Sequence, residues 1–319
     1  MITTPAELFS RHRSNPILTA EDWPVSVNTV FNPGACQVDG ETVLICRVED
    51  TRGISHLWVA RSSDGASDWR VDKEPLLSPR PNVESEQWGL EDPRVVRVEE
   101  LNSWAITCTA YGPTGPAVAL FITDFNTVQM RGLVMPPEDK NASLFPRRIN
   151  GDWVLIHRPV TVHSGPKAEI WLSRSRDLDA WRRPERVLRT RPGAWWDSVR
   201  LGTGPPPIET PQGWLLIYHG VRNTSNGSIY RVGLALLDLD RPSRVLHRSP
   251  DWVLAPTTPY ERIGDVPNVV FPCGAIHDFD RDEIRLYYGA ADTSIALATG
   301  KLSDILEYLQ TCPPSNGQN

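Results

Sequence analysis

The feature that most constrains the fold is a unit that occurs five times along the chain. In each copy a proline opens an apolar stretch, a turn and a second apolar stretch follow, and a third comes next. The five prolines are 60, 53, 60 and 66 residues apart: Pro33, Pro93, Pro146, Pro206 and Pro272. This period is too long for a short solenoid repeat and suits a four-stranded blade with its loops. The sequence therefore predicts an all-β fold, a five-bladed β-propeller.

The five units fill the chain, so we expect one domain over residues 1–319. Domains dominated by β structure often exceed 200 residues, which makes this length acceptable. A short N-terminal extension over residues 1–14 and a C-terminal tail over residues 311–319 are expected to flank the units. Only the stretch from Leu302 to Gln310 has a helical pattern.

Composition excludes several classes of partner. The formal charge is −6 and no run is rich in lysine or arginine, so neither nucleic acid nor an anionic membrane is an expected partner. The stretch from Met1 to His12 lacks the apolar centre of a signal peptide, and no stretch approaches the roughly 18 apolar residues of a membrane span. We expect a cytoplasmic protein. The sequence allows a homo-oligomer without specifying one.

Cysteine and histidine spacing indicates no metal site. The five cysteines form no CxxC pair and mostly stand in strand-like runs, which is typical of small buried side chains in a reduced protein. The seven histidines form no HxxxH pair and no cluster with cysteine. We therefore expect neither a metal nor an organic cofactor.

One carboxylate stands out in the motif Trp88-Gly89-Leu90-Glu91-Asp92-Pro93-Arg94. Proline favours the first residue of a strand, which predicts that Asp92 lies at a strand's end, behind the large side chain of Trp88. Partial burial raises a carboxyl pKa, so Asp92 is a candidate proton donor. A single Asp-Pro is more often only a turn; the recurrence of the unit is what favours a functional site.

In a propeller, the starts of the innermost strands and the ends of the second strands meet at one face. Residues placed there are Asn32, Arg47, Glu49, Asp92, Arg147, His157, Arg158, His219, Asp292 and the loop 202–207. Cations outnumber carboxylates in this part of the chain once Arg94, Lys140 and Arg200 are included. Because arginine binds phosphate or carboxylate through two hydrogen bonds, the pattern predicts a site for a small anion. The alternative is that these arginines pair with acidic residues across blades.

A sugar is the second expected ligand. Sugar sites combine an aromatic platform with a few planar polar groups. Candidate platform residues are Trp88, Tyr111, Trp195, Trp196, Tyr218 and Tyr230. Asp92 has no obvious partner carboxylate to activate water, as ordinary inverting glycoside hydrolysis requires. If phosphate replaces water as the nucleophile, no base is needed, and the cations can bind the phosphate.

Ordered motifs along nearly the whole chain resemble those of glycoside hydrolase family 130, the inverting mannoside phosphorylases and related β-mannosidases. They include Phe31-Asn32-Pro33, Arg47-Val48-Glu49, Gly89 to Arg94, Lys140-Asn141, His157-Arg158-Pro159, Gly202 to Ile208, Tyr218-His219-Gly220 and Ala291-Asp292. The resemblance implies a five-bladed propeller in which Asp92 is the general acid. In β-1,4-acting members its proton is thought to pass through a hydroxyl of the mannosyl unit.

The resemblance also implies ligand contacts. Arg147, His157 and Arg158 match positions that bind phosphate, and Arg200 stands where the family pattern has a lysine. Asn32, Arg47 and Asp292 match positions that hold the terminal mannosyl unit. We add four further residues to the expected substrate contacts: Glu49, Lys140, His219 and Tyr230.

Three functions remain open at this point. The first is an inverting phosphorylase that cleaves a β-1,2- or β-1,4-linked mannoside with inorganic phosphate as co-substrate to give α-mannose 1-phosphate. The second is an inverting β-mannosidase, which needs a carboxylate base about 6.5–9.5 Å from Asp92, with Glu49 or Asp292 as candidates. The third is a mannoside-binding propeller without catalysis. The cations favour the first.

Overall fold

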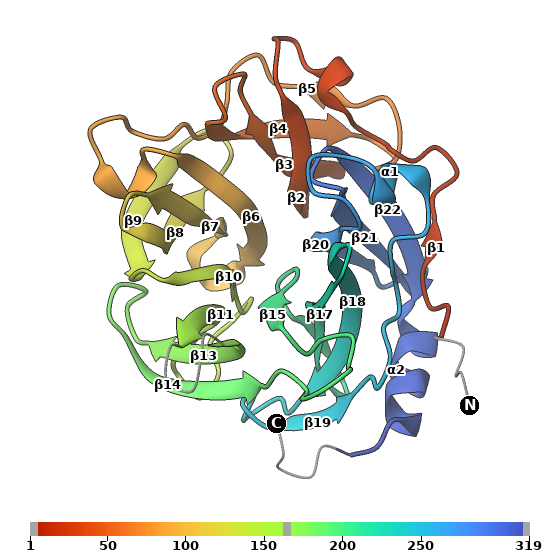
Figure 1. The fold of residues 1–319 in the computed structure, drawn as a ribbon. Coiled ribbons are helices and arrows are strands. Elements are labelled where there is room, and N and C mark those ends of the chain that lie inside the picture. The colour runs from red at the N-terminus through yellow and green to blue at the C-terminus, as the bar shows by residue number, and fades with distance from the viewer. Residues whose placement is uncertain (1–5, 162–166, 315–319) are drawn as a thin grey trace.

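The computed structural model describes residues 6–161 and 167–314, and their strands form five antiparallel groups around a common centre (Figure 1). Blade 1 contains β2 (Thr29–Val38), β3 (Glu41–Glu49), β4 (Ser55–Ser62) and β5 (Arg70–Val71). Blade 2 contains β6 (Gly89–Val98), β7 (Ser103–Gly112), β8 (Gly115–Thr123) and β9 (Val128–Met135). Blade 3 contains β10 (Asp139–Leu144), β11 (Trp153–Thr161), β13 (Ile170–Ser175) and β14 (Trp181–Leu188). The predicted all-β, five-bladed propeller is confirmed.

The remaining blades bring the two ends of the chain together. Blade 4 contains β15 (Arg200–Thr203), β16 (Ile208–Thr210), β17 (Gly213–Thr224), β18 (Gly227–Leu237) and β19 (Val245–Arg248). Blade 5 contains β20 (Val270–Asp278), β21 (Glu283–Ala290), β22 (Ser294–Lys301) and, from the start of the chain, β1 (Ser10–Arg11). β1 pairs with β22 in antiparallel register. Residues 10–11, expected in an extension, therefore complete the last blade.

Short elements link and cover the blades. A parallel bridge from Ser55 to Gly89 joins blades 1 and 2, and β12 (Lys167–Ala168) bridges to Arg200 of β15. The predicted C-terminal helix is α2 (Leu302–Thr311), and α1 (Pro259–Arg262) is a single turn. In the described part of the chain, 3₁₀ turns occupy Ala20–Asp22, Glu84–Glu86 and Glu99–Leu101.

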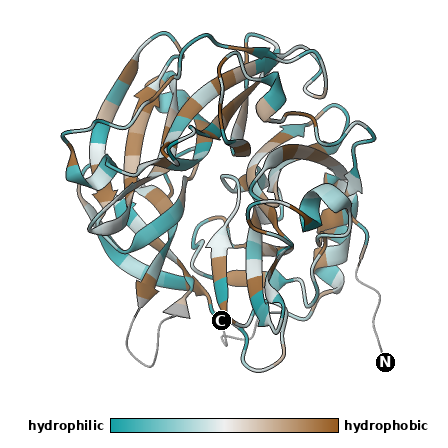
Figure 2. Ribbon diagram, turned by 45° about the horizontal axis from the view of Figure 1, so that its top comes forward, coloured by the Kyte–Doolittle hydropathy of each residue, from teal (hydrophilic) through white to brown (hydrophobic). Residues whose placement is uncertain are grey.

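Hydrophobic side chains are layered between neighbouring blades. Figure 2 shows hydrophobic and hydrophilic residues in alternating bands along the strands, as expected where successive side chains point to opposite faces. α2 buries Leu302, Ile305, Leu306 and Leu309 in the cluster shared with β17, β18 and β21. All five cysteines are buried and free, as predicted. Within the described ranges, no helix is long and apolar enough to cross a membrane.

A bulge recurs in the innermost strands and corrects one prediction. The pairing register shifts after Phe31 in β2, after Glu91 in β6 and after Lys140 in β10. Pro93 therefore lies inside β6 at a bulge and does not open the strand; a bulge tolerates its missing N–H.

The bulge sets the backbone at three matching positions. Asn32, Asp92 and Asn141 all have positive φ, at 46°, 49° and 54°. Asn and Asp enter this region more readily than other non-glycine residues. The fold therefore places a short polar side chain at the same point of three successive inner strands.

Candidate active site

Asp92 is buried at the centre of a hydrogen-bonded group from blades 1 and 2. Its Oδ1 accepts hydrogen bonds from Asn32 Nδ2 at 2.8 Å and from Arg47 Nη1 at 3.1 Å. Arg47 also donates from Nη2 to Glu91 Oε1 at 3.0 Å, and its guanidinium lies over the ring of Phe31. The structure thus brings the predicted residues Asn32, Arg47 and Asp92 together.

The charge state of Asp92 differs from the sequence-based expectation. Burial favours the neutral carboxyl, but the positive charges of Arg47, Arg94 and Lys140 outweigh it and lower the pKa of Asp92 to about 2. Trp88 does not enclose the carboxyl: it is 44% exposed and packs edge-on against Tyr111. The expected rise in pKa was wrong because the sequence does not show how many cations surround Asp92.

The pKa of a second carboxyl group, that of Asp292, shifts in the opposite direction. Asp292 follows β21 with φ of 50°. Burial and the negative charge of Asp92 raise the pKa of Asp292 to about 7. Near neutral pH the site therefore contains one ionised aspartate and one that still carries its proton much of the time.

We expect Asp292→Asn to stabilise the protein only at higher pH. The unfolded carboxyl titrates near its ordinary value of 3.8 and the folded one near 7, so the folded state binds the proton more tightly. Stability is therefore lost as pH rises from about 4 to 7. The variant should be more stable by about 4 kcal/mol at pH 8 and nearly unchanged at pH 4, measured by urea unfolding.

Asp280→Asn, in an exposed turn of blade 5, is the matched control and should show no such pH dependence. An equal effect of Asp292→Asn at both pH values would contradict the assignment.

Buried and half-buried cations from blades 3 and 4 share one region. Lys140 stands opposite Arg158 in the register of β10 and β11. Burial and the charge of Arg200 lower the pKa of Arg158 to about 10, and burial lowers the pKa of Lys140. The Nε atoms of Arg158 and Arg200 are buried without a hydrogen-bond partner among the described residues. Like charges held together in this way favour a bound anion.

His219 and Asn141 lie beside these cations. Gly202 of β15 faces both, and a Cβ atom there would lie 2.4 Å from Asn141 Nδ2 and from His219 Nε2, so only glycine fits. Burial and the charges of Arg94 and Arg158 lower the pKa of His219 well below its ordinary range, leaving a neutral imidazole. His219 Nδ1 and both amide atoms of Asn141 are buried with no partner in the described chain. Such atoms are normally satisfied by a ligand or by water.

Asn141 was not among the predicted site residues, although Lys140-Asn141 was one of the motifs. The signal was its equivalence to Asn32 and Asp92 at the inner-strand bulge. No proline follows Asn141, so the repeat pattern did not mark it.

Arg94 stabilises the backbone around the site. Its guanidinium is buried and donates to the carbonyl oxygens of Asp92 at 2.5 Å, Thr203 at 3.1 Å and Gly204 at 3.2 Å. These bonds tie β6 to β15, so Arg94 holds the acid and the glycine-rich strand in fixed relation.

Two predicted phosphate ligands lie elsewhere. Arg147 forms an ion pair with Glu209 and stacks over Trp214. Pro146 and Glu209 line a different cavity, formed by the later halves of the inner strands. Arg147 is thus at the opposite end of the channel from Asp92, because β10 runs through the ring between Asn141 and Arg147.

His157 is also unavailable to phosphate. Its Nδ1 lies 2.6 Å from Asp139 Oδ2 and its Nε2 lies 3.0 Å from Ser173 Oγ. Since neighbours on a strand point to opposite sides, His157 and Arg158 cannot both face the site. His157 instead holds β10 and β13 against β11.

The other predicted contacts lie at the edge of the cluster. Glu49 accepts a hydrogen bond from Asn28 Nδ2 at 2.9 Å and lies 3.8 Å from Arg47. Tyr230 packs beside His219 and Phe271, and the guanidinium of Arg200 lies over its ring.

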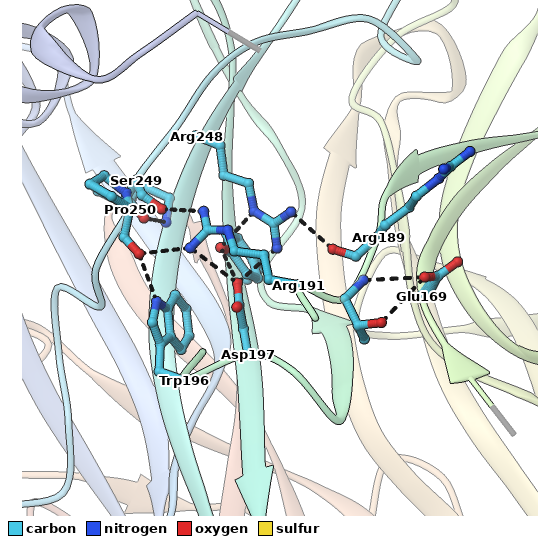
Figure 3. A network of polar contacts seen from close by, with 11 residues as sticks. Glu169, Arg189, Arg191, Trp196, Asp197, Arg248, Ser249 and Pro250 are labelled. Carbon is cyan, nitrogen blue, oxygen red and sulfur yellow. Dashed lines mark hydrogen bonds and ion pairs between the residues drawn. The ribbon is translucent and has the colours of Figure 1, made fainter. Parts of the chain in front are cut away.

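The loop before Arg200 is held by a buried ion network, shown in Figure 3. Asp197 Oδ2 accepts a hydrogen bond from Arg248 Nη2 at 2.8 Å and lies 3.6 Å from Arg191 Nη1. Trp196 Nε1 donates to the carbonyl oxygen of Pro250 at 3.0 Å. These contacts fix the backbone three residues before Arg200 and so limit where its side chain can reach.

Within the described part of the chain, no group of three or more His, Cys, Asp or Glu side chains is placed to hold a metal. The site contains Asp92, Asp292 and Glu91 together with several cations and neutral hydrogen-bonding groups. It can hold an anion beside a carboxyl group that exchanges a proton.

Two curated mannoside phosphorylases are similar to this chain over most of its length. The curated beta-1,4-mannooligosaccharide phosphorylase of Ruminococcus albus is 33% identical over 96% of this chain and 92% of its own. The 1,2-beta-oligomannan phosphorylase of a Thermoanaerobacter species is 37% identical over 86% of this chain and 91% of its own.

The similar solved structures include a phosphorylase and a protein described among glycoside hydrolases. The beta-1,2-mannobiose phosphorylase of Listeria innocua, in complex with beta-1,2-mannobiose, superposes with a TM-score of 0.86 and 31% identity, covering 95% of this chain and 99% of that one. Another, 25% identical with a TM-score of 0.79 over 91% of this chain and 93% of that one, is a family member described among glycoside hydrolases that target beta-1,2 mannosidic linkages in Candida mannan. The sequence model described as beta-1,4-mannooligosaccharide phosphorylase matches residues 8–311. This chain belongs to glycoside hydrolase family 130.

Proposed function

We propose that the protein is an inverting phosphorylase that cleaves a β-mannoside with inorganic phosphate, giving α-mannose 1-phosphate and a saccharide shorter by one mannosyl unit. The observation that carries the proposal is the group formed by Lys140, Arg158 and Arg200 near Asp92, with guanidinium nitrogens that have no partner among the described residues. The names of three curated relatives, each a phosphorylase of mannosides, support it.

Phosphate fits this group better than water does. A buried cluster of like charges is costly unless an anion offsets it, and arginine binds phosphate oxygens in pairs. Asn141 and neutral His219 supply further hydrogen bonds at the same place. Held there, phosphate is positioned for attack at the anomeric carbon, and the cations stabilise the charge it carries.

Phosphate binding also prepares Asp92 for its role. In the free protein the surrounding cations keep Asp92 ionised, with a pKa of about 2. A bound phosphate places negative charge beside these cations and so offsets their effect on Asp92. The pKa of Asp92 then rises, and the carboxyl can carry the proton that the leaving oxygen needs.

The reaction balances without another reactant. A phosphate oxygen forms the new bond to the anomeric carbon as the glycosidic C–O bond breaks. Asp92 gives its proton to the departing oxygen, and the proton that hydrogen phosphate loses on becoming a sugar phosphate restores Asp92. Asn32 and Arg47 hold the Asp92 carboxylate in place.

The second candidate is an inverting β-mannosidase with Asp292 as base. Its raised pKa of about 7 suits a general base. However, that rise comes partly from the nearby charge of Asp92, whereas an inverting base must stand across the sugar from the acid. Hydrolysis also makes no use of Arg158 and Arg200, whereas phosphorolysis uses them to bind phosphate.

The test is a time course on β-1,2- and β-1,4-mannobiose, each with and without phosphate. We expect one of the two substrates to be consumed only when phosphate is present, with one sugar phosphate formed for each mannose released. Equal release of mannose with and without phosphate would establish the hydrolase instead. Stabilisation by mannosides without any product would indicate a binding protein.

A further inference from the structure

A second pocket that joins aromatic rings to guanidinium groups lies on blade 4, apart from the residues assigned above. Its volume is about 330 Å³, and its walls include Trp195, Trp252, Arg222, Arg231 and Asp251. Trp195 is 44% exposed, so its ring is accessible from solvent.

The pocket opens at the same end of blade 4 as Arg200. In the antiparallel register Arg200 pairs with Val221, and Arg222 is the next residue of β17, so its side chain lies on the opposite face of the sheet at the same end of the strand. Trp195 precedes Arg200 by five residues, so their Cα atoms are at most about 18 Å apart. A short oligosaccharide covers that distance.

Trp196 forms a rigid wall of the pocket. Its indole packs so closely on β17 and β18 that a Cβ atom at Gly220 would lie 2.5 Å from its ring, and one at Gly233 2.6 Å. The Asp197 network of Figure 3 holds the adjoining backbone. Arg222 Nη1 donates to the carbonyl oxygen of Ala194, which ties the loop to β17. The pocket is therefore built into the fold.

The chemistry of the walls suits a sugar ring. Arg191 lies over Trp195, and Arg231 lies over Trp252 at 4.4 Å. The Nε of Arg231 is buried with no hydrogen-bond partner in the described chain. Aromatic faces beside a few planar polar groups are what sugar sites share. The carboxylate of Asp251 in the wall disfavours a bare anion relative to a neutral sugar.

We propose that this pocket binds a sugar unit of the oligosaccharide remote from the bond that is broken. The inference rests on the proposed function, since it takes the chain's substrate to be a manno-oligosaccharide. It predicts that the pocket favours substrates longer than a disaccharide.

The test compares mannobiose with mannotetraose of the same linkage in the wild type and in Trp195→Ala. We expect kcat/KM for the tetraose to fall about tenfold, as for loss of one good contact, and that for mannobiose to change less than about twofold. Arg222→Gln should show the same selectivity. Phe279→Ala, which removes an aromatic side chain 77% exposed on blade 5, should change neither substrate.

An equal loss on both lengths would mean local damage and would overturn the proposal, as would no loss on either. Calorimetric titration of both saccharides into wild type and Trp195→Ala measures binding alone. It therefore tests the pocket independently of whether the protein is a phosphorylase. If turnover proves independent of phosphate, the phosphorylase proposal fails, while a Trp195-dependent preference for the tetraose would still support the pocket.

Discussion

Asp92→Asn should lower kcat on mannobiose with phosphate by about 10³-fold while leaving the fold intact. General acid catalysis contributes roughly 10²- to 10⁴-fold, and Asp92 is the carboxyl bound directly by Asn32 and Arg47. The asparagine oxygen can still accept both hydrogen bonds, so the variant removes the exchangeable proton with little change in shape. Initial rates of sugar phosphate formation measure the effect.

An activated aryl mannoside is the internal control for this variant. Its leaving group departs without a proton, so Asp92→Asn should lose much less activity on it than on mannobiose. Substantial turnover of mannobiose, or an equal loss on both substrates, would contradict the assignment of Asp92 as the acid.

Arg158→Gln and Arg147→Gln should separate sharply in their phosphate kinetics. Hydrogen bonds to charged groups contribute about 1.5–3 kcal/mol, so loss of the Arg158 guanidinium should raise the KM for phosphate by roughly 10- to 150-fold. Arg147 pairs with Glu209 at the far end of the channel, and its loss should change this KM less than about twofold. Initial rates over a range of phosphate concentrations, at saturating mannoside, give both values.

The two variants make the same chemical change within one blade, Arg158 on β11 and Arg147 in the loop after β10, which controls for general effects of losing an arginine. A larger effect from Arg147→Gln would refute the position assigned to phosphate. Melting temperatures show whether either variant is damaged, since Arg158 is buried and Arg147 is half exposed.

The repeat predicted the five blades because each blade repeats the same turn and strand chemistry. It did not predict β1, since a two-residue strand has no periodicity and its pairing with β22 joins residues almost 290 apart. The prolines were interpreted as strand openings, but Pro93 lies at a bulge. That bulge is set by pairing with β7, which the local sequence does not contain.

The prediction of the candidate site was most accurate for residues whose type is compatible with a single position in the site. Asn32, Arg47 and Asp92 meet as expected. His157 and Arg147 were misplaced because the side of a strand on which a residue falls depends on bulges and pairing register. The opposite pKa shifts of Asp92 and Asp292 arise from charges contributed by several blades, so no local pattern encodes them.

The most direct test of a phosphate site facing Asp92 is ³¹P NMR of the wild-type protein acting on mannobiose in phosphate buffer. The account predicts a growing sugar phosphate signal with the coupling of an α-anomer, matched by the loss of inorganic phosphate. Consumption of mannobiose with an unchanged inorganic phosphate signal would contradict it.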